Sequence, residues 1–311
     1  MRATPFDPLP KKFDPSKASS DLLHHYGFPV GRWKDSWKGA KLIRPAFGKI
    51  SHKNHHSYDE RDSAWSGVVV SAPEGATINE VRGVWTIPKA YLPNGAPDGL
   101  TYAASSWLGI DGDGHSTDVL QVGVDSMVHT VRGKTERSFL AWWEWVPSNQ
   151  AFAARNFQKY EGQVKNFKIS AGETVDCQIS IDQKTKTRAT VYLYNRDKKV
   201  ASSFTVLAPR GTKLRGNCAE WIVEKIDFKN NFIFAKYDDV EFKNAEAITS
   251  NGKILQPGLG SSVAWRGIEI IDSEKRVISK GSSTHPARVR CFYVEQASDR
   301  ALSAAAGKAI S

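Results

Sequence analysis

The chain contains little cysteine and methionine and has no long apolar run. Only 3 Cys and 2 Met occur among 311 residues, and no two cysteines form a CxxC pair, which excludes a dense disulfide framework and argues against a zinc or dithiol site. No segment approaches the roughly 18 apolar residues of a membrane-spanning helix. With 40% hydrophobic and 24% charged residues, the chain is not a disordered polyelectrolyte. We therefore expect a folded protein that does not enter a membrane and is a monomer.

Acidic residues are in the minority, and the excess positive charge is confined to the two ends. The net charge is +10. Residues 1–62 contain 12 Lys and Arg against 7 Asp and Glu, residues 249–311 contain 9 against 5, and residues 63–248 are nearly neutral with 22 against 21. A nucleic-acid-binding domain would concentrate its cations on the folded body. We therefore expect basic solvated ends and no nucleic-acid partner.

The N-terminal stretch lacks the apolar core of a signal peptide. It begins MRATPFDPLPKKFDP, which is proline-rich and charged, so an intracellular location is favoured. Ser19, followed by an acidic residue and two leucines, predicts a short helix that ends near Gly27. We expect residues 1–62 to form a mostly irregular basic arm or a pro-segment, and residues 297–311 to form a tail.

A histidine cluster in the arm invites a metal hypothesis. His52, His55 and His56 lie close together, but no set of acidic or cysteine partners stands nearby. A structural or catalytic zinc site needs three or four such ligands. We therefore expect a solvated linker here, and neither a metal nor a cofactor in the protein.

From residue 63 onward the pattern changes to short, alternating segments separated by Gly, Pro, Asn and Asp. Candidate strands cover residues 64–72, 78–87, 102–111, 118–130, 138–146, 173–182, 188–196, 200–207, 218–226, 232–242, 264–272 and 287–296. Many short strands with turn residues between them indicate a β-sandwich or barrel. The sequence shows neither βαβ alternation nor a repeat of 20–50 residues, which argues against a parallel α/β sheet and a propeller.

Four of these strands have one apolar face and one unusual polar face. Successive side chains of a strand point to opposite faces. The polar faces then carry Trp107, Gly109 and Asp111; Gln121, Gly123 and Asp125; Trp142 and Glu144; and Cys218, Glu220, Ile222 and Glu224. Ordinary solvent-facing positions use Lys, Thr, Ser and Glu. Indoles, glycines, amides and carboxylates without cations instead suit a groove that holds a polymer, either peptide or sugar.

Seven blocks of sequence resemble the glutamic peptidases (eqolisins) in order and spacing. They are Ala64–Gly67, Val84–Pro88, Trp107–Asp113, Leu120–Asp125, Ala141–Trp145, Ala219–Glu224 and Phe242–Ala247. The resemblance covers residues 63–248. It implies a sandwich of two curved antiparallel sheets, lectin- or glucanase-like in shape. It also implies an endopeptidase that acts on polypeptide. Residues 249–296 lie beyond the resemblance, and their own strand pattern predicts additional strands that complete the sandwich.

The family's catalytic dyad, a Gln and a Glu, falls by motif on Gln121 and Glu220. A Glu carboxylate can take a proton from the attacking water and return it to the leaving amine. A Gln amide can donate a hydrogen bond to the developing oxyanion. By the same resemblance, Trp65, Trp107, Asp111, Trp142 and Glu144 are expected to shape the cleft or bind substrate. Asp125 and Glu224 are expected to be less important.

The sequence also departs from the secreted members of that family. It has no signal peptide and is basic, and Gly114 and His115 stand where a disulfide cysteine is expected, which puts secretion and a strongly acidic optimum in doubt. Cys177, Cys218 and Cys291 allow at most one disulfide. Cys218 lies near Glu220 without a histidine partner, so it is expected to be a small neighbour and not a nucleophile.

Two other functions remain open at this point. A glycan-binding or glycan-hydrolysing sandwich would also use an aromatic groove, and a hydrolase of this kind needs two carboxylates about 5–9.5 Å apart. An inactive relative that serves as a binding module would keep the same residues without the required geometry.

Overall fold

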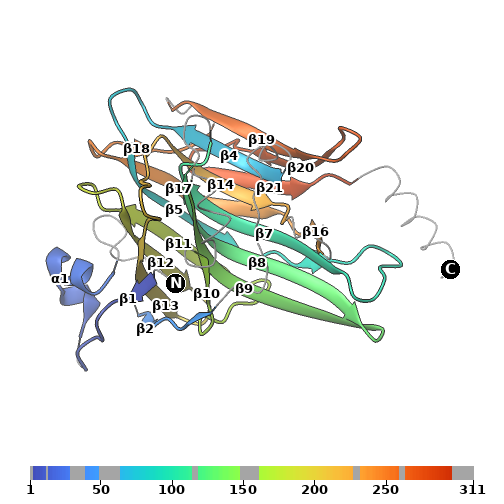
Figure 1. Cartoon of the computed structure of the whole chain (residues 1–311), viewed down its shortest axis with the longest axis horizontal. Coiled ribbons are helices and arrows are strands. Elements are labelled where there is room, and N and C mark those ends of the chain that lie inside the picture. Colours follow the sequence, from blue (N-terminus) through green and yellow to red (C-terminus); the bar gives the residue numbers. More distant parts are fainter. Residues whose placement is uncertain are drawn as a thin grey trace.

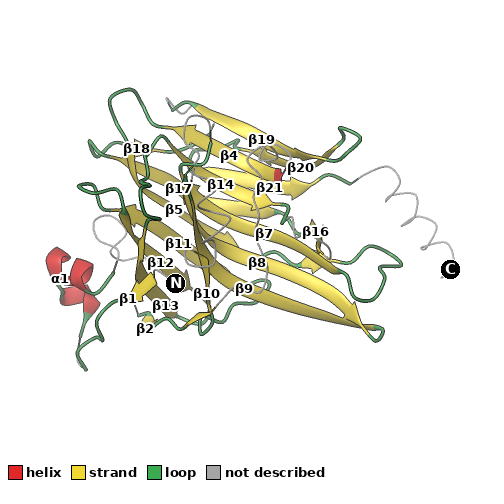
Figure 2. Ribbon diagram, in the orientation of Figure 1, coloured by secondary structure: helices red, strands yellow, loops and turns green. Residues whose placement is uncertain are grey.

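The computed structural model describes residues 3–11, 13–28, 39–48, 64–113, 118–147, 161–226, 232–258 and 263–295. They form an almost entirely β protein, in which long strands run across the molecule and a short helix lies near its N-terminal end (Figure 2). Among these residues, no helix is long and apolar enough to cross a membrane. His52, His55, His56, Gly114, His115 and the predicted tail at 297–311 lie outside the described residues.

One curved sheet, called sheet 1, carries the four strands with unusual polar faces. Its order is β3 (Phe47–Gly48), β10 (Glu161–Val164), β9 (Lys134–Val146), β8 (Val119–Val131), β7 (Thr101–Ile110), β14 (Cys218–Glu224), β4 (Trp65–Ser71) and β19 (Trp265–Ile271). These neighbours are antiparallel. The short strand β15 (Phe232–Phe234) adds in parallel beside the start of β7.

The second sheet, called sheet 2, lies behind the first (Figure 1). Its order is β13 (Val200–Leu207), β12 (Arg188–Asn195), β11 (Thr174–Ile181), β5 (Ile78–Thr86), β17 (Val240–Thr249), β21 (Arg288–Tyr293), β20 (Val277–Ser282) and β19. Strand β18 (Ile254–Leu255) extends the sheet beside β17, and β6 (Ala90–Tyr91) pairs with β16 (Lys236–Tyr237) separately.

Strand β19 belongs to both sheets and joins them at one side. Its first half pairs with β4 and its second half pairs with β20. The bend requires close backbone contact: a Cβ atom on Gly281 would lie 2.1 Å from the carbonyl oxygen of Gly67, which is far too close for any side chain. Glycine at both positions therefore allows the sheets to meet.

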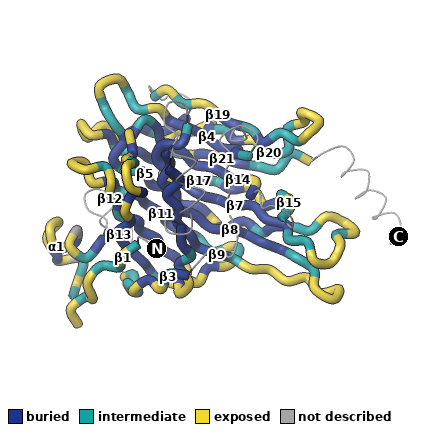
Figure 3. Tube along the Cα trace, viewed as in Figure 1, coloured by how far each residue is buried: buried dark blue, intermediate teal, exposed yellow. Residues whose placement is uncertain are grey.

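A single apolar core fills the space between the two sheets. It combines residues of sheet 1, such as Leu108 and Val122, with residues of sheet 2, such as Val81 and Ile179, all fully buried. Buried positions run along the strands, whereas exposed positions gather in the turns (Figure 3). The alternation along each strand means that the side chains between core residues point to the outer face of their sheet.

The predicted strands are found, but one of them is divided, and several observed strands, among them β10, β20 and most of β17, were not predicted. The stretch predicted as one strand, 232–242, is broken because Asp238 leaves the ladder: its carboxylate accepts hydrogen bonds from the backbone N–H of Lys89 (3.1 Å) and the hydroxyl of Tyr91 (2.6 Å). Strand β20 was not predicted, because its glycine and lysine weaken the strand pattern.

The N-terminal residues add short elements to the edge and outer face of sheet 2. Strands β1 (Ala3–Pro5) and β2 (Lys41–Ile43) both pair with β13, and β3 then continues into sheet 1. The 3-10 turn η1 (Pro15–Lys17) precedes helix α1 (Ser20–His25). The predicted N-cap is present, since the backbone N–H of Leu22 donates to Ser19 Oγ at 3.3 Å. Apolar side chains of this segment pack against Tyr192 and Tyr194.

Candidate functional site

The predicted alternation on the four strands of sheet 1 is confirmed. Leu120, Val122, Trp143, Trp145 and Trp221 join the core between the sheets. A second apolar cluster lies on the outer face of sheet 1 and includes Trp65, Trp107, Met127, Trp142 and Ile222. The polar side chains singled out from the sequence share this outer face.

Strand register places five of these positions side by side in one row across sheet 1. Glu220 pairs with Gly109, Gly109 with Gln121, Gln121 with Glu144, and Glu144 with Glu161. We call this the Glu220 row. Neighbouring strands are about 4.8 Å apart, so Glu220 and Gln121 are separated by about 10 Å of backbone with a single strand between them. Residues about 100 positions apart in the chain thereby flank one point on the sheet.

That point is occupied by glycine. A Cβ atom on Gly109 would lie 3.0 Å from Trp107 Cζ3, 3.2 Å from the carbonyl oxygen of Leu120 and 3.4 Å from Glu220 Oε1. A Cβ on Gly112 would lie 2.9 Å from the same Glu220 oxygen. Two glycines therefore leave room around the Glu220 carboxyl, and they place it over the strand that separates it from Gln121.

Gln121 is oriented by its neighbour in the row. Its amide Nε2 donates a hydrogen bond of 2.6 Å to Glu144 Oε2, and both side chains are fully buried. An amide NH2 group has two hydrogens, so one remains after this bond is made. Glu144 thus fixes which way the amide faces and leaves a donor available on the same nitrogen.

The indole side chains form a parallel row beside the Glu220 row. Trp107 pairs with Gly123, and Gly123 with Trp142. The rings of Trp65 and Trp107 meet edge to face with centroids 4.9 Å apart. Trp107 is held from its other end, since its Nε1 donates a 2.8 Å hydrogen bond to Glu224 Oε2. These contacts give the aromatic wall a fixed geometry.

Asp125 lies on the far side of the indole row. Its Oδ1 accepts a 2.6 Å hydrogen bond from the hydroxyl of Ser105. Burial raises the pKa of Asp125 to about 7, and the neighbouring carboxylates Glu224 and Glu144 add to the effect, partly opposed by Ser105 and Trp142. A carboxyl that keeps its proton to near neutrality can act as a hydrogen-bond donor.

Asp111 is surrounded by backbone N–H donors of the loop that precedes β14. Its carboxylate accepts backbone hydrogen bonds from Arg215 (2.6 Å), Gly216 (2.9 Å) and Asn217 (2.6 Å). Burial raises the pKa of Asp111, and these backbone donors oppose the increase. Its backbone φ is 64°, in the left-handed region that costs a non-glycine residue energy. Asp111 thus ties the end of β7 to the loop that leads into the Glu220 strand.

Among the described residues, the polar side chains predicted to line a groove are buried. Gln121, Glu144 and Glu220 each have 0% exposed surface. The second apolar cluster occupies the same face, and its indoles are much larger than the carboxyl and amide groups between them. The site is therefore assembled but closed to solvent.

The cysteines and metal-ligating residues add no further chemistry. Cys177, Cys218 and Cys291 are free and buried. Burial raises the pKa of Cys218 well above its ordinary value, with contributions from Glu220 and Asp111, which disfavours the nucleophilic thiolate. Within the described part of the chain, no cluster of three or more His, Cys, Asp or Glu residues could hold a metal ion.

Sequence patterns did not reveal Glu161 or the contacts of Asp125 and Glu224. Glu161 stands on β10, which has only 4 residues and so no readable alternation. Asp125 and Glu224 lie on the predicted face, but their contacts with Ser105 and Trp107 depend on register between strands. These contacts could have been predicted only from knowledge of how the strands pair.

Comparisons with known proteins identify the family of this chain. A family model described as the Peptidase A4 family matches residues 63–293. Aspergillopepsin-2 of Aspergillus niger is 30% identical over 224 residues, which cover 67% of this chain and 72% of that protein. Scytalidopepsin B of Scytalidium lignicola is 26% identical over 200 residues, which cover 62% of this chain and 65% of that protein.

A solved structure supports the fold. The crystal structure of scytalido-glutamic peptidase with a peptide-based transition-state analogue has a TM-score of 0.57 and 21% identity, and the match covers 75% of this chain and 98% of that chain. The predicted all-β sandwich and the resemblance of the seven sequence blocks are both confirmed. The family match spans well over half of the sequence, so this chain belongs to the Peptidase A4 family, the glutamic peptidases, and is a peptidase.

Proposed function

We propose that the protein is an endopeptidase that hydrolyses polypeptide with Glu220 and Gln121 as its catalytic residues. The observation that carries the proposal is the Glu220 row, in which a buried carboxyl and a buried amide flank a glycine on one face of sheet 1. The two matched relatives are peptidases, and the solved structure of one glutamic peptidase holds a peptide-based transition-state analogue.

Glu220 is the general base and acid of the proposed reaction. Its carboxylate removes a proton from a water molecule as the water oxygen attacks the scissile carbonyl carbon. It then returns this proton to the amide nitrogen as the C–N bond breaks, which leaves a carboxylic acid and an amine. Proton transfer by a positioned side chain contributes typically about 10²–10⁴-fold in rate.

Gln121 stabilises the intermediate. The N–H that Glu144 does not use donates to the oxyanion that forms when the carbonyl is attacked. Removing one such donor costs on the order of 10²–10³ in kcat. Because Glu144 holds the amide in place before substrate arrives, little reorganisation accompanies the reaction.

The remaining predicted residues have supporting roles in this proposal. Trp65, Trp107 and Trp142 form the aromatic wall against which an extended peptide lies. Asp111 positions the Glu220 strand through its backbone hydrogen bonds, and so acts as a positioning residue. Because Glu220 has no exposed surface, this face must open before a peptide reaches it.

A casein digest at several pH values between 2 and 7 tests the proposal, with mass spectrometry of the products and of the protein's own N-terminus. Glu220→Ala and Gln121→Ala should each abolish cleavage while the circular dichroism spectrum is retained. Glu246→Gln is the matched control, because it alters a buried glutamate of sheet 2 and should leave cleavage unchanged. Full activity of Glu220→Ala would disprove the assignment.

A further inference from the structure

A cavity of about 750 Å³ lies on the opposite side of the molecule from the Glu220 row. Its floor is the outer face of sheet 2, where Ser180 and Thr190 alternate with core residues on β11 and β12. Its wall is the N-terminal segment, which contributes Phe6, Asp7 and His25. The two sheets and their shared core separate this cavity from the proposed active site. Its volume falls within the range of about 300–1,000 Å³ that is typical of small-molecule sites.

The N-terminal wall is firmly attached to the sheet. Ser203 Oγ donates a hydrogen bond to the carbonyl oxygen of Gly27, and the ring of Phe6 packs so closely on Gly27 that a Cβ there would lie 2.2 Å from it. Gly27 also has a φ of 75°, a conformation that glycine adopts without strain. The cavity is thus a feature of the folded chain.

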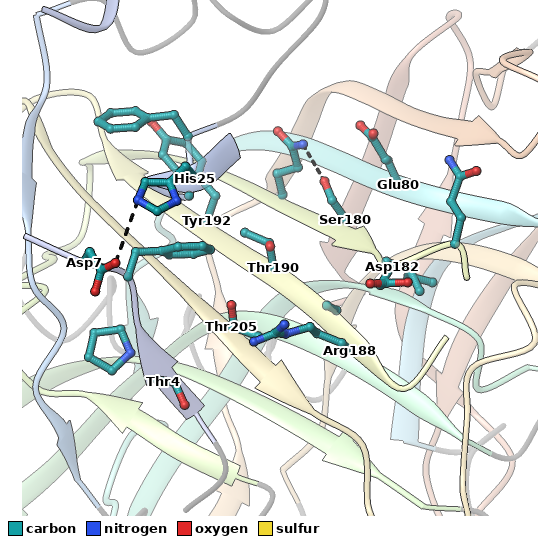
Figure 4. A pocket seen from close by; sticks show the side chains of 18 of the residues that line it. Thr4, Asp7, His25, Glu80, Ser180, Asp182, Arg188, Thr190, Tyr192 and Thr205 are labelled. Carbon is teal, nitrogen blue, oxygen red and sulfur yellow. Dashed lines mark hydrogen bonds and ion pairs between the residues drawn. The ribbon is translucent and has the colours of Figure 1, made fainter. Parts of the chain in front are cut away.

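Two polar groups at the cavity lack partners. The hydroxyl of Tyr192 is buried, the whole residue is 2% exposed, and it has no hydrogen-bond partner among the described residues. The carboxyl of Glu80, which is only partly buried, lies at the other end of the cavity (Figure 4) and makes no hydrogen bond or ion pair with the described residues. Burial raises the pKa of Glu80 to about 7. Buried polar groups are normally hydrogen-bonded, so the Tyr192 hydroxyl points to a missing partner.

The charged side chains at the cavity are close to balanced, with Asp7, Glu80 and Asp182 against His25, Lys184 and Arg188. Asp7 pairs with His25, with 3.8 Å between Oδ2 and Nε2, and Asp182 interacts electrostatically with Arg188. A phosphate or nucleotide site would present unopposed cations, and a site for a cation would present unopposed carboxylates. The balance therefore favours an uncharged ligand.

The hydrogen-bonding groups at the cavity are mainly hydroxyls and amides, which both donate and accept. Gln178 and Ser180 are bonded to each other at 2.9 Å, and Thr190 and Thr205 stand between them and the N-terminal wall (Figure 4). The ring of Phe6 supplies an apolar surface. An extended peptide is disfavoured, because β11 and β12 are paired on both sides and offer no free strand edge.

We propose that this cavity binds a neutral saccharide, with Glu80 and the Tyr192 hydroxyl bonding its hydroxyl groups and Phe6 contacting its apolar face. Binding is independent of the catalytic residues, because it occurs on the other side of the sandwich. The site requires the N-terminal segment, which supplies one wall.

Isothermal titration calorimetry and saturation-transfer NMR test this proposal on the full chain with Glu220→Gln, which prevents self-cleavage. The probes are maltose, cellobiose, diacetylchitobiose and mannobiose, with a neutral tripeptide as the competing class. We expect at least one disaccharide to bind. Tyr192→Phe and Glu80→Gln should each weaken its binding about tenfold, the effect of losing or neutralising one hydrogen bond.

Tyr194→Phe is the matched control, because Tyr194 lies on the same outer face of β12 but does not line the cavity. It should leave saccharide binding unchanged. Absence of binding of all four disaccharides at about 10 mM, binding of the tripeptide alone, or binding that survives both Tyr192→Phe and Glu80→Gln would each overturn the proposal. In the otherwise unmodified chain, Tyr192→Phe and Glu80→Gln should keep full casein cleavage, so this proposal and the proposed function can fail separately.

Discussion

The outer faces of the two sheets both bury charged side chains, but they do so in different ways. On sheet 2, Arg82 makes two hydrogen bonds to Asp176, of 3.0 and 2.6 Å, and Arg196 adds a third of 3.0 Å. On sheet 1, the buried charged side chains are carboxyls. They lie around the indoles of Trp107 and Trp142 and around Gly109 and Gly123. Beyond Glu220 itself, the Glu220 row continues through Val69 on β4 to Arg266 on β19. Arg266 is a cation, and it forms a salt bridge with Asp113 at the surface.

The difference separates a structural face from a chemical one. A buried ion pair with all its hydrogen bonds satisfied fixes the packing of its strands, and a lost partner leaves an uncompensated charge. Buried like charges instead work against folding and are kept where a reaction uses them. Mutations on the two faces should therefore affect different measurements.

The largest stability effect is expected on sheet 2. Arg82→Met leaves Asp176 buried with only Arg196 beside it, and should lower the free energy of unfolding by about 3–5 kcal/mol. Urea unfolding measures the loss, while kcat on casein per folded molecule should not change. Arg276→Met removes an exposed pair with Asp272 and should cost less than about 1 kcal/mol. Equal losses in the two variants would erase the distinction between the faces.

Replacing a glycine with alanine tests the comparison between the two faces, because the added methyl group crowds the side chains around it. In Gly109→Ala the new methyl group would lie 3.0 Å from Trp107 and 3.4 Å from Glu220 Oε1, so kcat should fall about 10–100-fold. This corresponds to about 1.4–2.7 kcal/mol of transition-state stabilisation.

Gly83→Ala is the control, because its methyl group would meet Trp221, also at 3.0 Å, within the core of the sandwich. It should lower the thermal midpoint and leave kcat unchanged. If Gly83→Ala reduced kcat as much as Gly109→Ala, the space beside Glu220 would have no special role.

Much of this site could be predicted from the sequence, because strand alternation is a local property. The faces of Gln121 and Glu220 follow from their neighbours, and the sequence blocks give their roles by family resemblance. The partners of Asp125, Glu161 and Glu224 could not be predicted, since register between strands depends on turns and bulges far from these residues. The closure of the face also depends on packing, which alternation does not report.

Part of the pH dependence of stability is carried by Asp125. Its pKa is about 7 in the folded protein and 3.8 as the ordinary value, so the folded state holds a proton between these values that the unfolded state has lost. The stabilising contribution of Asp125 is complete below about pH 4 and falls as pH rises toward 7, by about 1.4 kcal/mol for each pH unit. The basic net charge alone would not suggest this preference for mild acid.

Asp125→Asn should flatten this part of the profile, which thermal unfolding between pH 4 and 7.5 would measure. Glu80→Gln on the outer face of sheet 2 should flatten a similar window, because burial also raises its pKa to about 7. A profile that kept its slope in both variants would show that other groups set it.

The smallest effect is expected for Glu224→Gln. The amide oxygen can still accept the Trp107 indole N–H, so the hydrogen bond remains while the negative charge is lost. Glu224 contributes to the raised pKa of Asp125, and the substitution should therefore stabilise the protein at pH 7.5, by up to about 1 kcal/mol, with no gain at pH 4. Urea unfolding at both pH values measures the difference. Destabilisation at both pH values would mean that the fold requires the charge of Glu224, as it requires the charge of Asp176. The contrast between the two faces would then be limited to the Glu220 row.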